Sequence, residues 1–204
     1  VDATALPEQV TDDVVTSAFR SAGQRCSALR LLCVQEDVAD PIVTMIAGAA
    51  QELKIGDPRE PSTHVGPVID AEAKDKLDGW IARMAGQGRV RFRWDTAGSL
   101  PAAGTYVPPT IIAFDRARDL TEEVFGPVLH VVRWRADKLD QLRDDIAVNG
   151  YGLTLGSHSR IDETAEHIVQ RLANGNVYVN RNMIGAVVGT QPFGGSGLSG
   201  TGPK

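Results

Sequence analysis

The hydrophobic pattern predicts helices over five segments of the chain, because apolar residues recur there at helical spacing and so share one face. These segments are Glu8–Ser21, Asp37–Leu53, the stretch after Asp70 with Leu77, Ile81 and Met84, Leu139–Val148, and Asp162–Ala173. Pro7 suits the first turn of the first helix, and Gly23 follows its end. Asp70 is a suitable cap for the third helix.

Strand patterns separate these helices. Arg30–Gln35, Val128–Trp134 and Asn176–Asn180 are rich in apolar and β-branched residues, whereas Arg89–Trp94 alternates between charged and apolar residues. That alternation predicts a half-exposed strand whose arginines face water. Helices that alternate with strands indicate an α/β fold: an open, twisted, largely parallel sheet with flanking helices, whose loops at one end of the sheet carry the chemistry.

Composition narrows the class of protein. The chain has 204 residues, of which 42% are hydrophobic and 23% charged, as expected of one folded domain. No run approaches the roughly 18 apolar residues of a membrane span. The start Val-Asp-Ala-Thr has no basic segment ahead of an apolar one, so we expect no secretory signal. A net charge of −5, with basic residues spread along the chain, disfavours a nucleic-acid partner. Two cysteines make neither a disulfide framework nor a metal site, so we expect reduced thiols and a cytoplasmic location.

Cys26 is the candidate nucleophile. It lies in the polar, glycine-containing turn Ser21–Ser27 between a predicted helix and a predicted strand, where a substrate can reach a thiol. The positive charge of Arg25 favours a thiolate at this position. Cys33 falls among apolar strand residues, where we expect a buried, inert thiol. The sequence pairs none of the four histidines with Cys26, so a general base is a carboxylate or lies outside this chain.

Two further segments are unusual. Gly195–Gly200 matches the dinucleotide pattern Gly-x-Gly-x-x-Gly, but the four residues after it leave no room for the required helix. We therefore favour a loop whose backbone passes close to another element. Thr121–Pro127 places two carboxylates and an aromatic ring before a Gly-Pro turn. Such a segment can bind ribose hydroxyls and wall a planar ring, and an acidic turn that caps a strand is the alternative.

Three motifs carry a family resemblance through their order along the chain: Gly23–Cys26, Glu122–Pro127 and Pro192–Gly197. Their succession resembles the aldehyde dehydrogenase superfamily over essentially the whole chain. Three further runs are closest to one branch of it: Phe19–Arg30, Gln35–Asp40 and Asn180–Gly189. They resemble the L-glutamate γ-semialdehyde (pyrroline-5-carboxylate) dehydrogenase module of bacterial bifunctional proline-utilisation proteins.

The resemblance implies an NAD-dependent oxidation of glutamate semialdehyde to glutamate in proline catabolism. Cys26 is the implied nucleophile, which forms a hemithioacetal and then a thioester that water hydrolyses. Glu123 is implied to bind the nicotinamide ribose, and Phe125 to pack beside it. The implied substrate contacts are Ser27, Gly185, Ala186 and Phe193.

The resemblance also implies parts that lie outside this chain: the glutamate base, an asparagine oxyanion donor, the NAD-binding domain and a C-terminal strand of the dimer interface. We therefore expect residues 1–204 to be the cysteine-bearing catalytic domain of a longer, homo-oligomeric parent. That parent is expected to be bifunctional, with FAD in its proline dehydrogenase half, and peripheral membrane attachment stays open. The fragment alone is expected to be inactive. Another semialdehyde dehydrogenase, a non-catalytic module and a thiol hydrolase are the alternatives.

Overall fold

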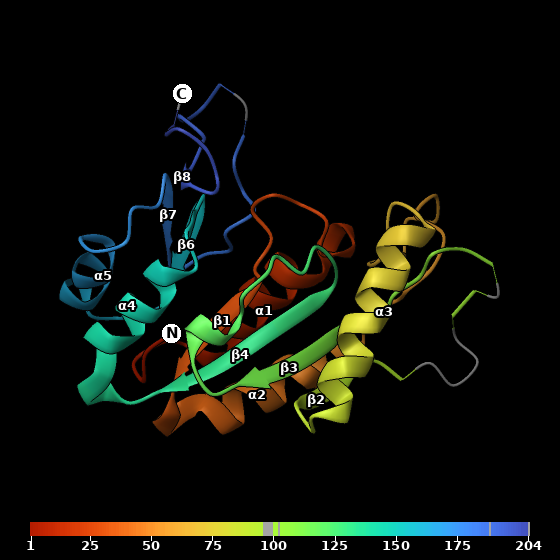
Figure 1. Cartoon of the computed structure of the whole chain (residues 1–204), viewed down its shortest axis with the longest axis horizontal. Coiled ribbons are helices and arrows are strands. Elements are labelled where there is room, and N and C mark those ends of the chain that lie inside the picture. Colours follow the sequence, from red (N-terminus) through yellow and green to blue (C-terminus); the bar gives the residue numbers. More distant parts are fainter. Residues whose placement is uncertain (96–99, 102, 188, 204) are drawn as a thin grey trace.

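A four-stranded sheet in the order β1-β4-β3-β2 lies at the centre of the structure (Figure 1). Its strands are β1 (Leu31–Gln35), β2 (Val90–Arg93), β3 (Thr110–Phe114) and β4 (Val128–Trp134). Both β1 and β3 run parallel to β4, whereas β2 is an antiparallel edge strand. The computed structural model describes residues 1–95, 100–101, 103–187 and 189–203. The α/β fold and its largely parallel sheet are confirmed, and β2 is the antiparallel strand at one edge.

Two smaller sheets lie beside the main one, in the upper left of Figure 1. β5 (Tyr151–Gly152) pairs antiparallel with β8 (Ser196–Gly197), and β6 (Thr154–Ser157) pairs parallel with β7 (Asn176–Val179). The sequence predicts β7 but not its partner β6, and it misses β3 in the main sheet. The single predicted sheet is therefore divided, because β7 pairs with a strand that the hydrophobic pattern does not reveal.

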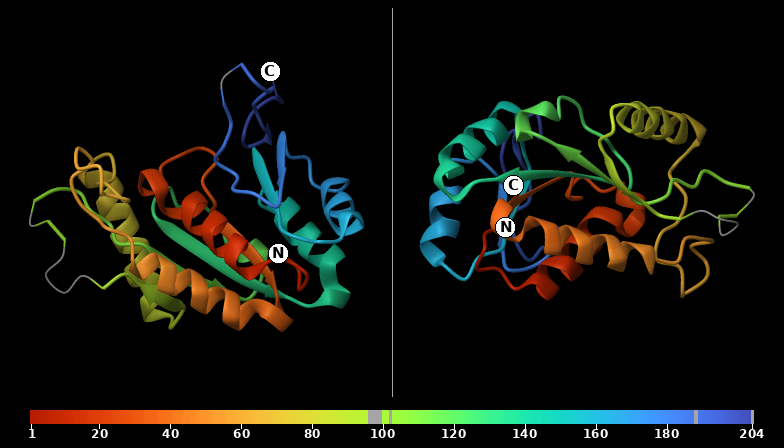
Figure 2. Two further views of the ribbon diagram at one scale, coloured as in Figure 1. Left: turned by 180° about the vertical axis from the view of Figure 1, so that it is seen from behind. Right: turned by 90° about the horizontal axis from the view of Figure 1, so that it is seen from below.

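Helices cover both faces of the main sheet. α1 (Pro7–Phe19) and α2 (Glu36–Gln51) lie on one face, and α3 (Ala71–Gly86) and α4 (Leu139–Val148) lie on the other (Figure 2, right). α5 (Asp162–Val169) flanks the small sheets. Short 3₁₀ turns are η2 (Ala117–Asp119) and η3 (Ala136–Lys138). The predicted bounds of α1, α2 and α4 hold within two residues.

α5 is the helix whose predicted end is wrong, because it stops at Val169 rather than Ala173. After it, Leu172 is buried, and the Gly175 N–H donates to Gly152 O at 3.0 Å. The chain therefore turns early to bring β7 alongside β6.

The local signals for α1 and α3 act as predicted. Pro7 occupies the first turn of α1, and Asp70 caps α3 by accepting a hydrogen bond from the Ala73 N–H at 2.8 Å. The predicted apolar faces of both helices are buried: Val10, Val14, Ala18 and Phe19 of α1, and Leu77, Ile81 and Met84 of α3. Full burial of one large aliphatic or aromatic side chain contributes about 1.5–3 kcal/mol, so these faces dock the helices on the sheet.

The arginines of the predicted strand Arg89–Trp94 only partly follow the expectation, and the first of them lies just before β2. Arg91 and Arg93 are exposed, as predicted, but Arg89 is half-buried over the Phe114 ring at 5.3 Å and pairs with Asp115 at 3.2 Å. In the described part of the chain, no helix combines the length and the apolar character that a membrane crossing requires.

Candidate active site

Cys26 lies in a sharply folded connection between α1 and β1. The chain leaves α1 through Ser21, Ala22 and Gly23, whose φ angles of 54°, 53° and 63° are all left-handed. Glycine adopts such angles without strain, whereas a non-glycine residue with these angles lowers the stability of the fold by about 1 kcal/mol or more. We call Gly23–Ser27 the cysteine turn. It carries Cys26 on its exposed side, so the prediction of an accessible thiol is confirmed.

The cysteine turn packs against the stretch before β4, Glu122–Gly126, which we call the acidic segment. A Cβ atom at Gly23 would lie 2.2 Å from Gly126 O, so only glycine fits there. A Cβ at Gly126 would lie 2.4 Å from Leu77 Cδ1, because α3 covers this glycine from the other side. Two segments that are distant in sequence therefore meet backbone to backbone.

Cys26 lines two separate pockets. The acidic pocket, of about 200 Å³, also contains Glu122 and Glu123 of the acidic segment and Tyr151 of β5. The Phe193 pocket, of about 340 Å³, is lined by Arg25, Cys26, Ser27, Ile184, Ala186, Val187, Gln191 and Phe193. A thiol at the junction of two pockets can contact a molecule in either one. This arrangement suits a reaction between two bound molecules.

Three of the four expected substrate contacts lie together in the Phe193 pocket: Ser27, Ala186 and Phe193. Gly185 is not among the residues that line this pocket. A Cβ at Gly185 would lie 2.2 Å from Arg181 Nη2, so this glycine faces the Arg181 side chain. Its role in substrate binding stays a prediction. Val188, in the run Asn180–Gly189, lies outside the described residues.

The acidic segment presents a carboxylate and an aromatic ring to solvent. Glu123 is exposed, Phe125 is 40% exposed, and Gln24 Nε2 donates to Phe125 O at 3.2 Å. An ionised carboxylate accepts hydrogen bonds from a ribose diol, and an open aromatic face packs against a planar ring. The residues present therefore fit the nicotinamide end of NAD+. Glu122 instead pairs with Arg83 at 3.3 Å in an exposed ion pair, which contributes under about 1 kcal/mol.

Arg30 is the charged group that lies beneath both the cysteine turn and the acidic segment. Its Nη2 donates to Arg25 O at 3.1 Å, and its Nη1 donates to Gly126 O at 3.2 Å. Burial lowers the pKa of Arg30 to about 10, against the opposing effect of the nearby Glu123 and Cys26 side chains. Arg30 also lines the acidic pocket, so its positive charge acts on that pocket.

None of the four histidines lines either pocket at Cys26. His64 accepts a hydrogen bond from the Lys54 N–H at 2.9 Å, and His167 contacts Asp140 at 2.9 Å. His130 is fully buried between β4, α3 and Arg30. His158 lies 3.6 Å from Asp13 in another cavity. Each histidine has a contact away from the thiol, and the identity of a general base stays a prediction.

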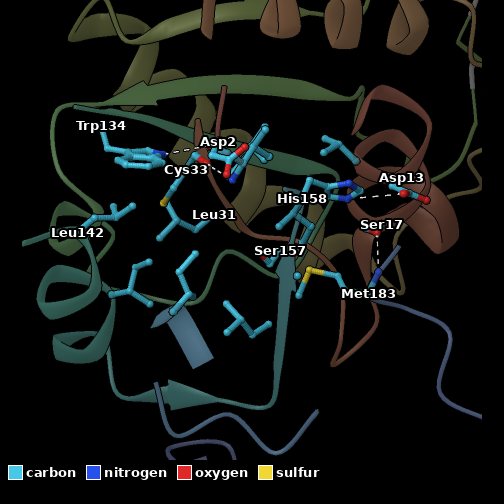
Figure 3. A pocket seen from close by; sticks show the side chains of 18 of the residues that line it. Asp2, Asp13, Ser17, Leu31, Cys33, Trp134, Leu142, Ser157, His158 and Met183 are labelled. Carbon is cyan, nitrogen blue, oxygen red and sulfur yellow. Dashed lines mark hydrogen bonds and ion pairs between the residues drawn. The ribbon is translucent and has the colours of Figure 1, made fainter. Parts of the chain in front are cut away.

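That other cavity, of about 100 Å³, lies between the main sheet and the small sheets (Figure 3). Side chains such as Leu31, Leu142 and Met183 line it, and Cys33 faces it from β1. Cys33 is half-buried rather than fully buried, and burial raises the pKa of its thiol to about 12. The thiol is therefore protonated near neutral pH and a poor nucleophile, as predicted.

The glycine-rich tail is a close-packed loop. Gly195–Gly200 contains β8 and a turn closed by the Ser199 N–H on Ser196 O at 3.1 Å, and no helix follows among the described residues. A Cβ at Gly195 would lie 2.8 Å from Leu153 Cα. The preference for a loop that lets backbones approach, over a dinucleotide fingerprint, is confirmed.

Comparison with known proteins identifies the family. The sequence model of the aldehyde dehydrogenase family matches residues 1–204. The chain belongs to the aldehyde dehydrogenase family. This aldehyde dehydrogenase chain is 55% identical over 208 residues to the bifunctional protein PutA of Klebsiella aerogenes. It matches a crystal structure of bifunctional proline utilization A with a TM-score of 0.94 and 65% sequence identity. It also matches a structure of 1-pyrroline-5-carboxylate dehydrogenase from Thermus with bound NAD, with a TM-score of 0.86 and 34% sequence identity.

The aldehyde dehydrogenase chain spans only part of these proteins. All of it aligns with the Klebsiella protein, but it covers 16% of that protein. It covers 20% of the proline utilization A chain and 38% of the Thermus enzyme. The resemblance to the superfamily and to its pyrroline-5-carboxylate branch is confirmed.

Two residues of this aldehyde dehydrogenase site escape the sequence reasoning. The sequence pattern assigns Arg30 to the first position of a predicted strand, and it assigns Gln24 to a polar turn. In the structure, Gln24 accepts a hydrogen bond from the Ile69 N–H at 2.9 Å in addition to its bond to Phe125 O. The available signal for Arg30 was a charged residue at the start of an apolar strand. A charged side chain at such a position usually has an interaction partner.

Proposed function

We propose that residues 1–204 are the nucleophile-bearing catalytic domain of an NAD-dependent dehydrogenase that oxidises L-glutamate γ-semialdehyde to glutamate in proline catabolism. The observation that carries the proposal is the position of Cys26, which lines both the acidic pocket and the Phe193 pocket. The Phe193 pocket has room for a short aldehyde, and the acidic pocket offers groups that suit a nicotinamide ribose. The similarity to PutA and to pyrroline-5-carboxylate dehydrogenase supports the choice of substrate.

In the proposed reaction, the Cys26 sulfur adds to the aldehyde carbon and forms a hemithioacetal. Bound NAD+ would supply the hydride acceptor for that carbon. The hydroxyl proton of the hemithioacetal would pass to the general base outside this chain, which leaves a thioester on Cys26. Water hydrolyses the thioester to the carboxylic acid and restores the thiol. The backbone N–H of Cys26 is the proposed donor to the developing oxyanion on this chain.

The remaining side chains bind and orient. Ser27 and Ala186 hold the α-carboxylate and amino end of the substrate, with Gly185 beside Ala186, while Phe193 walls its aliphatic chain. Glu123 binds the nicotinamide ribose, and Phe125 packs beside it. A domain of the same polypeptide supplies the rest of the cofactor site and the general base. A homo-oligomeric parent and a cytoplasmic location belong to the same proposal, and two free thiols support the latter.

The test is NADH production by the full-length polypeptide supplied with NAD+ and glutamate semialdehyde. Cys26→Ser is expected to lower turnover by on the order of 10³-fold or more, because a hydroxyl without strong activation is a poor nucleophile. Cys33→Ser is the matched comparison, since it replaces the other thiol in the same way. Cys33 also lines the acidic pocket, so this variant is expected to lose far less turnover than Cys26→Ser rather than none.

Two outcomes contradict this proposal. Unchanged NADH production by Cys26→Ser refutes the role of that thiol. Preference for a different semialdehyde over glutamate semialdehyde refutes the substrate but leaves the chemistry intact.

A further inference from the structure

We propose that Arg30 is a positioning residue, whose guanidinium fixes the cysteine turn and the acidic segment in one mutual geometry. The inference rests on the proposed function for the roles of Cys26, Glu123 and Phe125. Under this proposal, one half-buried side chain holds the nucleophile and the cofactor contacts in a fixed relative position. Arg30 itself is not proposed to touch the reacting atoms.

The backbone of Arg30 is fixed by the centre of the sheet. Its carbonyl oxygen accepts hydrogen bonds from both the backbone N–H and the Nδ1 of His130, each at 2.9 Å. His130 is fully buried in β4, and its Nε2 accepts the indole N–H of Trp80 from α3 at 3.1 Å. The base of the Arg30 side chain is therefore tied to β4 and α3.

The guanidinium of Arg30 bonds to both segments at once. On the cysteine turn it donates from Nη1 to Gly23 O and from Nη2 to Arg25 O at 3.1 Å. On the acidic segment it donates from Nη1 to Gly126 O at 3.2 Å. The planar fork of arginine presents several donors in a fixed geometry, and a single ammonium cannot match that arrangement.

Arg30 also supports the aromatic ring that faces the cofactor. Its Cζ lies 4.7 Å from the centroid of Phe125, which is a cation–π arrangement. Phe125 is still 40% exposed, so the contact leaves part of the ring open. The orientation of the ring therefore depends on the same group that holds the cysteine turn.

The electrostatics indicate that Arg30 does more than stabilise the fold. Burial works against its charge, and its Nε is buried without a hydrogen-bond acceptor among the described residues. Removing a charge from water and leaving one buried N–H without an acceptor both lower the free energy of unfolding. These two features of Arg30 therefore do not stabilise the fold. Glu123, and after it Cys26, favour the charged form of Arg30 and so oppose the effect of burial on its pKa, and the proposed function places both residues in the reaction.

The experiment compares Arg30→Ala with wild type in the full-length polypeptide. Calorimetry without aldehyde is expected to show an NAD+ dissociation constant raised about tenfold, and the KM for NAD+ is expected to follow. The KM for the aldehyde is expected to rise as well, because Arg25, Cys26 and Ser27 of the cysteine turn line the Phe193 pocket. A purely structural defect lowers the active fraction and leaves both KM values unchanged, so a rise in KM separates the two roles.

Two further measurements sharpen the test. Added guanidinium ion is expected to restore NAD+ affinity to Arg30→Ala, because it refills the vacated site. Arg30→Lys keeps the charge but not the fork, and it is expected to remain impaired by several-fold. Arg91→Ala is the matched control, since Arg91 Nη1 donates to Gly88 O at 2.7 Å on the exposed edge strand. It is expected to leave NAD+ affinity unchanged.

The inference is overturned if Arg30→Ala folds and binds NAD+ within about twofold of wild type. If Arg30→Ala does not fold, Arg30→Lys decides the question by the same criterion. Wild-type protein that binds NAD+ but does not oxidise glutamate semialdehyde contradicts the proposed substrate and leaves the Arg30 test valid. Wild-type protein that does not bind NAD+ overturns both proposals.

Discussion

His130 illustrates how a residue without access to the thiol supports the site. Its ring is stacked on Phe114 with centroids 5.3 Å apart, and it receives the indole N–H of Trp80. Because Nε2 accepts that proton donor, Nδ1 carries the ring proton and donates to Arg30 O. Burial lowers the pKa of His130 to about 4, so the neutral ring is the form that this network requires.

The depressed pKa of His130 predicts a loss of stability in mild acid. The unfolded chain takes up this proton near the ordinary histidine value of about 6.5, whereas the folded chain does so only near pH 4. Stability is therefore full above about pH 6.5 and falls as the pH drops toward 4, by about 2 kcal/mol at pH 5. Urea unfolding of the chain at about pH 7.5 and about pH 5 measures this difference.

The control variants separate this effect from other titrations. His130→Gln is expected to be less stable at neutral pH but to lose less stability between the two pH values. His64→Gln changes an exposed histidine and is expected to keep the wild-type pH dependence. Equal pH dependence in wild type and His130→Gln contradicts the prediction.

At the scale of elements, the connection from α1 to β1 sets the position of the nucleophile. Its left-handed residues turn the chain sharply, and the close approach of Gly23 to Gly126 seats the cysteine turn on the acidic segment. The side chain of Leu77 in α3 occupies the space that a Cβ atom at Gly126 would need. The spacing between the Cys26 thiol and Glu123 therefore depends on two glycines rather than on side-chain packing alone.

Gly23→Ala is expected to destabilise the chain by about 2–4 kcal/mol, because it adds left-handed strain to a clash with Gly126 O. Turnover by the full-length polypeptide is expected to fall at least about tenfold, since the cysteine turn must shift. Urea unfolding and NADH production measure the two effects. Gly48→Ala in α2 is the control, because nothing lies within 4 Å of its Cβ position, and it is expected to stabilise by about 0.5–1 kcal/mol.

At the scale of the whole molecule, the described residues offer groups that suit one end of a cofactor. Glu123 and Phe125 suit a nicotinamide ribose and ring, while no helix that can bind a pyrophosphate follows Gly195–Gly200 among the described residues. The acidic pocket and the Phe193 pocket meet at Cys26 on the surface of the chain. In the proposed function, another domain of the same polypeptide covers the acidic pocket and completes the site.

The 204-residue chain alone is therefore expected to bind NAD+ with a dissociation constant weaker than about 1 mM, which corresponds to about −4 kcal/mol. Calorimetry on the isolated chain, with circular dichroism to verify folding, measures this affinity. The full-length polypeptide is the positive control. Micromolar binding by the isolated chain contradicts the proposal that another domain supplies most of the cofactor site.

The sequence by itself determined the elements whose signals are local. The 3.6-residue period of α1 and α4, the cap at Asp70 and the apolar run of β4 act over a few neighbouring residues, so they could be predicted from the chain alone. The exposure of Cys26 could also be predicted from the sequence, because a polar turn around a cysteine is a local feature. β3 carries the signal of a buried strand in Thr110–Phe114, a short apolar run that periodicity alone does not distinguish from a helix.

Only the tertiary structure decided which distant segments meet. The junction of two pockets at Cys26, the seating of Gly23 on Gly126 and the pairing of β7 with β6 all join residues far apart in sequence. The role of Arg30 is of the same kind, since its guanidinium binds carbonyl oxygens of two such segments. Local patterns carry no information on these contacts, because the free energy that selects them comes from burial and hydrogen bonding in the assembled fold.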